Sequence, residues 1–222
     1  MSSDNFLLLE KMITSIETII DRVVFVGGVT TFLYLNVDDA DIRATIDVDV
    51  IINANLRQLQ KTESELLKLG FQPDQELRCR HKKEDLILDL MPIDPSILGF
   101  TNRWYQKGIE TAIRKDIGKY SIKILSLEYF FATKIEAFLG RGKNDFYGSK
   151  DIEDIIAVLA GRTGAIEELQ SKTDTVIDYI KKHFGNWLKD ECFKQSVRGN
   201  FPANSKISPA QLLTDISSFV SA

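Results

Sequence analysis

Two aspartates alternate with apolar residues in segment 45–52, which reads Thr-Ile-Asp-Val-Asp-Val-Ile-Ile. Side chains two residues apart in a strand point to the same face, so Asp47 and Asp49 share one face while Ile46 and Val48 pack on the other. Adjacent carboxylates repel each other, and burying an unpaired charge costs free energy. A divalent cation such as Mg²⁺, which prefers a few carboxylates plus phosphate oxygens, offsets both costs. The segment therefore predicts a strand that carries a metal site.

A glycine pair, Gly27-Gly28, follows an apolar run at residues 23–26, about twenty residues before the aspartates. Glycines allow a backbone to approach phosphate groups closely, and a helix that follows them offers free N–H groups at its N-terminus. Thr30 and Thr31 would add hydroxyl groups there. A glycine pair is also consistent with a simple turn, but together with the aspartates it favours a nucleotide-binding corner.

A further acidic residue, Asp89, lies inside the apolar segment 86–91. A carboxylate in such a strand is costly unless something neutralises it. If this strand lies beside the one with the aspartate pair, three carboxylates around two metal ions, Mg²⁺ or Mn²⁺, can lower the pKa of an attacking hydroxyl and stabilise a departing pyrophosphate. A salt bridge is the alternative for Asp89. Asp94, in the proline-containing loop that follows, is a weaker candidate that we expect to cap a turn.

A second group of charged residues lies on two consecutive predicted helices. Lys134 is one residue away from the apolar face of the first helix, and Arg141 lies seven residues later near the same side. A lysine in this position can bind triphosphate oxygens as a point charge. Asp151 and Asp154 are neighbours on the second helix, so an ion pair that joins the two helices through Lys134 is the alternative.

Hydrophobic periodicity predicts a mixed sheet in the first half of the chain and helices in the second. The expected strands are 23–26, 45–52, 77–82, 86–91, 110–115 and 120–125, and the expected helices are 5–21, 30–35, 56–69, 127–139, 150–159, 165–171, 173–184, 187–195 and 209–220. Asp4, Ser126, Ser149 and Ser208 are expected N-caps, and 36–42 and 140–145 are expected loops. We predict an α+β fold, with a catalytic α/β domain at residues 1–125 and a helical domain at 126–222 that completes the site.

Composition is that of an ordinary globular protein, with 44% hydrophobic and 27% charged residues among 222. No apolar run is long enough for a membrane helix, the first residues lack the basic start of a signal peptide, and Cys79 and Cys192 suggest free thiols. We therefore expect a cytoplasmic protein. Residues 78–150 carry 14 basic and 9 acidic side chains, which favours polyphosphate or RNA as a ligand, with ordinary solvated charges as the alternative.

Four motifs, taken in order, resemble those of the AbiEii-like nucleotidyltransferases, which include abortive-infection toxins and the MenT-type toxins of bacterial toxin–antitoxin pairs. The motifs are Gly27-Gly28, Arg43-x-Thr45-x-Asp47-x-Asp49, Lys134-Ile135-Glu136-Ala137-Phe138-Leu139-x-Arg141 and Lys150-Asp151-Ile152-Glu153-Asp154-Ile155. The resemblance covers residues 23–160. It implies a polymerase-β-like nucleotidyltransferase fold, with a mixed sheet flanked by helices and a helical C-terminal half.

The resemblance also implies roles for single residues. Gly27 and Gly28 would cradle a nucleoside triphosphate, the aspartate pair would hold Mg²⁺, Lys134 would contact phosphates, and Asp151 would complete the helical part of the site. Members of this group transfer nucleotides to RNA, often to tRNA acceptor ends, and some modify proteins. This chain departs from the pattern at Lys150, where arginine is commoner, and many members of this branch lack a clear counterpart of Asp89.

The leading hypothesis is a Mg²⁺-dependent nucleotidyltransferase that moves a nucleoside monophosphate from a triphosphate to a hydroxyl group, with the 3′ end of tRNA as the expected acceptor. Asp89 or Asp151 would assist as a base or an orienting group. The resemblance makes the chain a candidate toxin, with a cognate antitoxin protein as a partner. Two alternatives stay open: a small-molecule nucleotidyltransferase of the aminoglycoside-modifying kind, and a degenerate nucleotide-binding scaffold.

Overall fold

The computed structural model describes residues 4–36, 42–142 and 145–222. The chain divides into two compact units, of which unit 1 comprises Met1–Thr30 and Ala44–Ser126, and unit 2 comprises Thr31–Arg43 and Leu127–Ala222. Most of the loop expected at 36–42 and the centre of the loop expected at 140–145 lie outside the described residues. Each unit is described below by itself.

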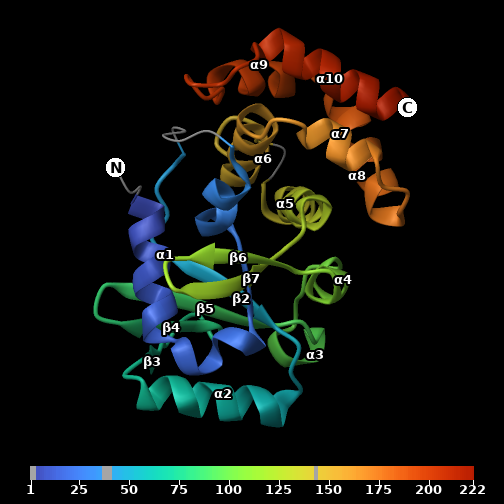
Figure 1. The fold of residues 1–222 in the computed structure, drawn as a ribbon. Helices are drawn as coiled ribbons and strands as arrows, with labels where there is room; N and C mark the ends of the chain where they lie inside the picture. Colours follow the sequence, from blue (N-terminus) through green and yellow to red (C-terminus); the bar gives the residue numbers. More distant parts are fainter. Residues whose placement is uncertain (1–3, 37–41, 143–144) are drawn as a thin grey trace. The chain divides into compact units, whose positions relative to one another are not determined.

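Unit 1 contains, among the described residues, a seven-stranded mixed sheet with the order β3-β4-β5-β2-β1-β7-β6 (Figure 1). The strands are β1 (Val24–Val26), β2 (Val48–Ile52), β3 (Gln72–Pro73), β4 (Arg80–Lys83), β5 (Leu86–Pro92), β6 (Ile113–Ile117) and β7 (Tyr120–Ile124). Strand β2 runs antiparallel to β1 and parallel to β5, and β1 runs parallel to β7. The strands that carry the predicted site residues are therefore neighbours in the middle of the sheet.

The first helix of unit 1, α1 (Asp4–Ser15), contacts β2 and β5. Its residues Leu9, Met12 and Ile13 recur at helical spacing and are fully buried, as are Val48 and Val50 of β2. Burying such side chains contributes about 1.5–3 kcal/mol each, so this packing fixes which face of β2 is apolar. The other face of β2 carries Asp49 and the buried Ile51.

The remaining helical segments of unit 1 follow local sequence signals. They are η1 (Glu17–Arg22), a 3-10 helix, and the α-helices α2 (Leu56–Lys68), α3 (Pro95–Leu98) and α4 (Tyr105–Glu110). Helix α2 begins with a capping box in which Asn55 and Gln58 bond each other's backbone N–H groups. Gly70, with a φ of 92°, follows its end.

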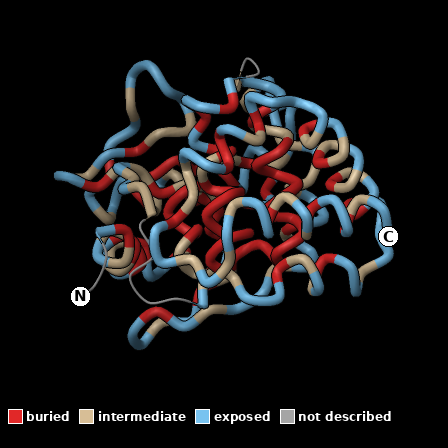
Figure 2. The backbone as a smooth tube through the Cα atoms, turned by 90° about the horizontal axis from the view of Figure 1, so that it is seen from above, coloured by how far each residue is buried: buried red, intermediate tan, exposed pale blue. Residues whose placement is uncertain are grey.

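Unit 2 is helical and holds an aromatic core. Its helices are α5 (Leu127–Arg141), α6 (Lys150–Gly161), α7 (Ala165–Gln170), α8 (Thr175–Trp187), α9 (Glu191–Gly199) and α10 (Pro209–Ser221). Helix α5 packs against α6 and α8, and α10 packs against α8. The edge-to-face pairs Phe131–Phe184 and Phe138–Trp187 link α5 to α8. Figure 2 marks the buried residues in red, and α5 and α6 are buried over most of their lengths.

Several expected boundaries are wrong. The helix expected at 5–21 is α1 followed by the 3-10 helix η1, and the helix expected at 187–195 begins at Glu191 because Trp187 still belongs to α8. Strand β2 begins at Val48 rather than at residue 45, so Ile46 is 71% exposed instead of packed. The strand expected at 110–115 begins at Ile113, because Glu110 ends helix α4.

Two of the four expected N-caps are confirmed and two are wrong. Ser149 and Ser208 accept hydrogen bonds from the N3 backbone N–H groups of α6 and α10, as predicted. Asp4 instead lies inside the first turn of α1, where its charge suits the helix dipole. The buried Oγ of Ser126 makes no hydrogen bond within the described part of the chain, so Ser126 precedes α5 without capping it.

Candidate active site

The three predicted acidic residues of unit 1 lie on, or directly before, two neighbouring strands. Asp49 of β2 lies directly beside Asp89 of β5 in the parallel register. Asp47 immediately precedes β2, two residues before Asp49, and a common hydrogen-bond partner places it with Asp89. Asp89 is 8% exposed. We call Asp47, Asp49 and Asp89 the acidic cluster.

The common partner is Arg80 of β4, whose backbone lies opposite Asp89 in the antiparallel β4–β5 pair. Its Nε donates to Asp89 Oδ1 at 2.8 Å and its Nη2 to Asp89 Oδ2 at 2.8 Å. The same Nη2 donates to Asp47 Oδ2 at 3.0 Å. The hydrogen bond with Asp89 raises the pKa of the Arg80 guanidinium above its already high ordinary value, so Arg80 is a permanent cation.

Gly27 meets the acidic cluster at the end of β1. Val26 pairs with Asp49 across the antiparallel β1–β2 ladder, and Gly27 follows it with a φ of 75°. A Cβ atom on Gly27 would lie 2.9 Å from Asp49 Cγ and closer still to Oδ2, so only glycine fits without displacing the carboxylate. Gly28 begins the 3-10 helix η2 (Gly28–Tyr34), and Thr30 Oγ1 donates to the carbonyl of Gly27 at 3.0 Å.

The acidic cluster fits the needs of a hard divalent cation in part. Its donor set is carboxylate oxygen, and Mg²⁺ is commonly held by one or two carboxylates together with substrate phosphates. Within residues 4–36, 42–142 and 145–222, no group of three or more histidine, cysteine or acidic side chains is arranged to hold one ion. Asp47 and Asp49 therefore fit a cation that a substrate helps to bind, whereas Asp89 is held by Arg80.

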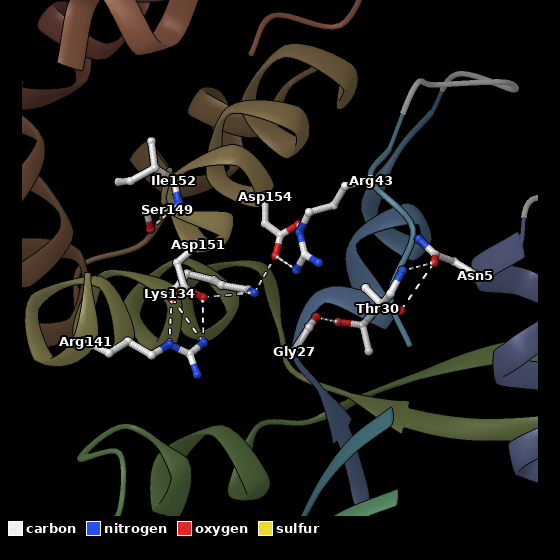
Figure 3. A network of polar contacts seen from close by, with 11 residues as sticks. Asn5, Gly27, Thr30, Arg43, Lys134, Arg141, Ser149, Asp151, Ile152 and Asp154 are labelled. Carbon is white, nitrogen blue, oxygen red and sulfur yellow. Dashed lines mark hydrogen bonds and ion pairs between the residues drawn. The ribbon is translucent and has the colours of Figure 1, made fainter. Parts of the chain in front are cut away.

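Unit 2 contains a buried ion-pair network between α5 and α6 (Figure 3). Lys134 Nζ, on α5, donates to Asp154 Oδ2 at 2.5 Å and to Asp151 Oδ1 at 3.2 Å, both on α6. Arg141 donates two hydrogen bonds to Asp151, from Nε to Oδ2 at 3.1 Å and from Nη2 to Oδ1 at 3.2 Å. Arg43 likewise donates two hydrogen bonds to Asp154, from Nε at 3.2 Å and from Nη2 at 2.9 Å. The alternative named for Lys134, an ion pair that joins two helices, is present.

The network holds three cations and two carboxylates. Lys134 and Asp154 are 5% and 0% exposed, whereas the side chain of Arg141 is 73% exposed. Burial opposes ionisation of Asp151, but Lys134 and Arg141 outweigh it and hold the pKa of Asp151 below its ordinary value. The excess of one positive charge includes an accessible guanidinium, which is suited to anion binding.

The remaining predicted residues have less specific places. Asp94 caps α3 by accepting from the N–H and the hydroxyl of Ser96, as expected for this weaker candidate. Thr30 and Thr31 are fully buried, and Thr31 Oγ1 has no hydrogen-bond partner among the described residues. Phosphate binding by either threonine stays a prediction.

Arg80 is the residue of this site that sequence reasoning missed. The salt bridge named as the alternative for Asp89 is present, but its partner was not identified. The hairpin between β4 and β5 fixes this pairing, but the sequence carries no signal for the length of its turn. Counting outward from a two-residue turn at Glu84 and Asp85 places Arg80 opposite Asp89, as the structure has it.

No protein-family profile and no curated protein sequence matches the chain. Its fold is similar to the crystal structure of an antigenic nucleotidyltransferase-like protein from Paracoccidioides brasiliensis, with a TM-score of 0.55 and 19% identity over 90% of this chain and 95% of the other. It is also similar to the solution structure of the antibiotic-resistance factor ANT(2'')-Ia, with a TM-score of 0.52 and 13% identity over 84% of this chain and 94% of the other.

At such low identity these likenesses concern the fold alone. Among the described residues, no helix is both long and apolar enough to cross a membrane. The central mixed sheet with its helices, together with the two similar structures, shows that this chain has the α+β, polymerase-β-like fold of nucleotidyltransferase-like proteins.

Proposed function

We propose that this protein is a nucleotidyltransferase that depends on a divalent cation, Mg²⁺ or Mn²⁺. The observation that carries the proposal is the acidic cluster beside Gly27, on adjacent central strands of a nucleotidyltransferase-like fold. Three carboxylates and one guanidinium leave two negative charges, which match one divalent cation. The intact aspartate pair, with the Asp49 carboxylate packed against Gly27, argues against a degenerate scaffold.

In the proposed reaction, a hydroxyl oxygen of the acceptor forms a bond to the α-phosphorus of a nucleoside triphosphate. The bond from that phosphorus to the bridging oxygen breaks, pyrophosphate leaves, and the hydroxyl proton passes to a carboxylate or to water. A bound divalent cation supplies charge neutralisation for the attacking and leaving oxygens. Asp47 and Asp49 hold the cation, and Gly27 and Gly28 leave room for phosphate oxygens.

The ion-pair network of unit 2 supports binding of a polyphosphate by its own charge. Lys134 is committed to Asp151 and Asp154, so the accessible cation is Arg141. Arg141 already donates from Nε and Nη2 to Asp151, so its contribution to phosphate binding is the accessible positive charge of its guanidinium. We therefore assign phosphate binding to Arg141 and, through the charge it adds to the network, to Lys134.

RNA is the acceptor that we propose, with the 3′ end of tRNA as the first substrate to examine. The basic character of residues 78–150 favours a polyanionic partner, and the resemblance of the four motifs to those of nucleotidyltransferase toxins, which often act on tRNA, supports the same choice. On the same basis we propose that the protein is a toxin with a cognate antitoxin protein.

Label transfer tests the reaction directly. Purified protein is incubated with each of the four α-³²P-labelled nucleoside triphosphates, Mg²⁺ or Mn²⁺, and total tRNA. We expect one or more labels to enter RNA, and we expect Asp49→Asn to abolish the transfer. Asp116→Asn, an exposed aspartate of β6 in the same unit, is the matched control and should keep full transfer. Absence of transfer with every nucleotide and both cations would contradict the proposal for RNA.

A second candidate acceptor is a cationic small molecule. The similarity to ANT(2'')-Ia, named as an antibiotic-resistance factor, favours this alternative, and residues 1–77 carry 13 acidic against 6 basic side chains. The same label-transfer experiment with a panel of aminoglycosides in place of tRNA distinguishes the two, because only one acceptor class should become labelled.

A further inference from the structure

Arg80 occupies the space between two carboxylates of the acidic cluster. Its Nη2 lies 2.8 Å from Asp89 Oδ2 and 3.0 Å from Asp47 Oδ2, and its Nε donates a hydrogen bond to Asp89 Oδ1. Both oxygens of Asp89 therefore accept from the guanidinium in the bidentate geometry that makes such pairs strong. Asp47 keeps its Oδ1 outside this contact.

Burial makes the contact of Arg80 with Asp89 persistent. The side chains of Arg80 and Asp89 are 19% and 12% exposed, so separating them would leave two charges poorly solvated. Removing one member of the pair would leave the other as a partly buried charge without compensation. A cation that bound through Asp89 would have to displace Arg80 or lie against its positive charge.

The charge balance of the acidic cluster leads to the same result. Three carboxylates and Arg80 together carry two negative charges, which one divalent cation neutralises. Two such cations would leave the carboxylates, Arg80 and the cations together with an excess of two positive charges, before any substrate phosphate is bound. Two-metal sites place their cations about 3.5–4 Å apart and need carboxylates that serve both, whereas both oxygens of Asp89 already accept from a guanidinium whose positive charge repels a cation.

We propose that Arg80 takes the place of a second divalent cation, so that the acidic cluster binds one cation through Asp47 and Asp49. Asp89 is then a positioning residue that holds Arg80, and it is neither a metal ligand nor the base. This inference rests on the proposed function and refines the metal content of its site. It differs from the expectation that all three carboxylates ligate metal.

Mn²⁺ binding to the full chain without nucleotide tests the inference. Free Mn²⁺ is measured by electron paramagnetic resonance during a titration, which gives the number of ions bound and their affinity. We expect one Mn²⁺ for each wild-type chain. Asp49→Asn should weaken binding by about tenfold or more, because cation affinity depends on the number of charged ligands.

The decisive variant is the double substitution Arg80→Gln with Asp89→Asn, which removes both charges and leaves two amide groups that can hydrogen-bond. The net charge of the acidic cluster and residue 80 together is unchanged. We therefore expect one bound Mn²⁺ with an affinity within about threefold of wild type, which is a difference in binding free energy of less than 1 kcal/mol. Arg80→Gln alone removes the partner of Asp89, so this variant should bind a second Mn²⁺ per chain. If that single variant fails to fold, the charge-neutral double variant still gives the answer.

Lys11→Gln with Asp85→Asn is the matched control, since it removes the exposed ion pair of α1 with the β4–β5 turn in the same unit. It should leave Mn²⁺ binding unchanged. Two bound ions in the wild type, or loss of binding in the Arg80 and Asp89 double variant, would overturn the inference while label transfer by the wild type kept the proposed function intact. A wild type that neither binds Mn²⁺ nor transfers label would overturn the proposed function itself.

Discussion

Gly27 has a φ of 75°, and the side chain of Asp49 fills the space in which its Cβ atom would lie. Gly27→Ala would add backbone strain of about 1–3 kcal/mol and would also push the Asp49 carboxylate away from its place. We expect a lower melting temperature together with weaker Mn²⁺ binding, measured by thermal unfolding and by the titration described above.

Gly99 supplies a matched control, because its φ is 81° and, among the described residues other than its chain neighbours, no heavy atom lies within 4 Å of the position of its Cβ. Gly99→Ala should therefore show the strain without the contact, so its melting temperature should fall while Mn²⁺ binding is unchanged. Equal Mn²⁺ binding by the two variants would show that the fit between Gly27 and Asp49 does not shape the acidic cluster.

Cys79, directly before Arg80, is a chemical probe of the same surroundings. Burial raises the pKa of the Cys79 thiol, and the nearby charge of Asp89 raises it further. Because the thiolate is the reactive form, Cys79 should be alkylated by iodoacetamide more slowly than the exposed Cys192 at neutral pH. Asp89→Asn should speed alkylation of Cys79 alone, as measured by peptide mass spectrometry. An unchanged Cys79 rate relative to Cys192 would contradict the stated cause.

The contact between α5 and α6 includes the ion-pair network. Removing Asp154 from this network should cost more stability than removing Lys134. Asp154→Ala would remove the carboxylate that accepts from Lys134 at 2.5 Å and from Arg43 at 2.9 Å, at a cost of about 3–5 kcal/mol. Lys134→Met would leave each acid still held by an arginine, so it should cost less, about 1–3 kcal/mol. Urea denaturation of both variants measures the two free energies, and a larger loss in Lys134→Met would refute this ranking.

The same network predicts a dependence of stability on pH. Despite burial, Lys134 and Arg141 lower the pKa of Asp151 in the folded chain, so its stabilising contribution is present above the unfolded pKa of about 3.9 and is lost as pH falls through the lower folded value. The stability lost in Arg141→Gln should therefore be clear at pH 7 and shrink below about pH 4. Urea denaturation at pH 7 and pH 3 checks this, and a difference that grew on acidification would contradict it.

The hairpin between β4 and β5 shows why the site could be predicted only in part. The expected turn of three residues, from Lys83 to Asp85, shifts the register by one and would place Cys79 rather than Arg80 opposite Asp89. The structure has a two-residue turn in which Glu84 takes a φ of 52°, which is unusual for a residue other than glycine. Without a glycine, the sequence carries no signal for such a turn.

Patterns with a clear period were predicted more reliably. The aspartate pair and its apolar neighbours mark β2, and the apolar faces of α5 and α6 follow a helical period, so the sheet-then-helix order could be predicted from sequence. Short elements such as α3, α4 and β3 have too few residues to show a period. The partners of Lys134 could be named only as alternatives, because helix spacing does not tell which charges meet across two helices.

At the scale of the whole molecule, charge is distributed unevenly along the chain. Residues 1–77 have a net charge of −7 and residues 78–150 a net charge of +5, against −4 in total. In the proposed reaction, the charge that remains on the acidic cluster after Arg80 is counted serves the cation of the nucleotide, which either acceptor class needs. The basic segment 78–150 is therefore the feature that favours RNA over an aminoglycoside as the acceptor.

Expression in a bacterial host tests that preference on the intact protein. If the protein nucleotidylates tRNA, induced wild type should stop growth by disabling tRNA, whereas Asp47→Asn, which removes one of the two proposed metal ligands, should permit growth at an equal level of soluble protein. Growth curves, immunoblots and the state of tRNA 3′ ends in the arrested cells give the measurement. Asp116→Asn should arrest growth as the wild type does. Normal growth of the wild type, together with raised aminoglycoside resistance that Asp47→Asn removes, would instead assign the small cationic acceptor and reject RNA.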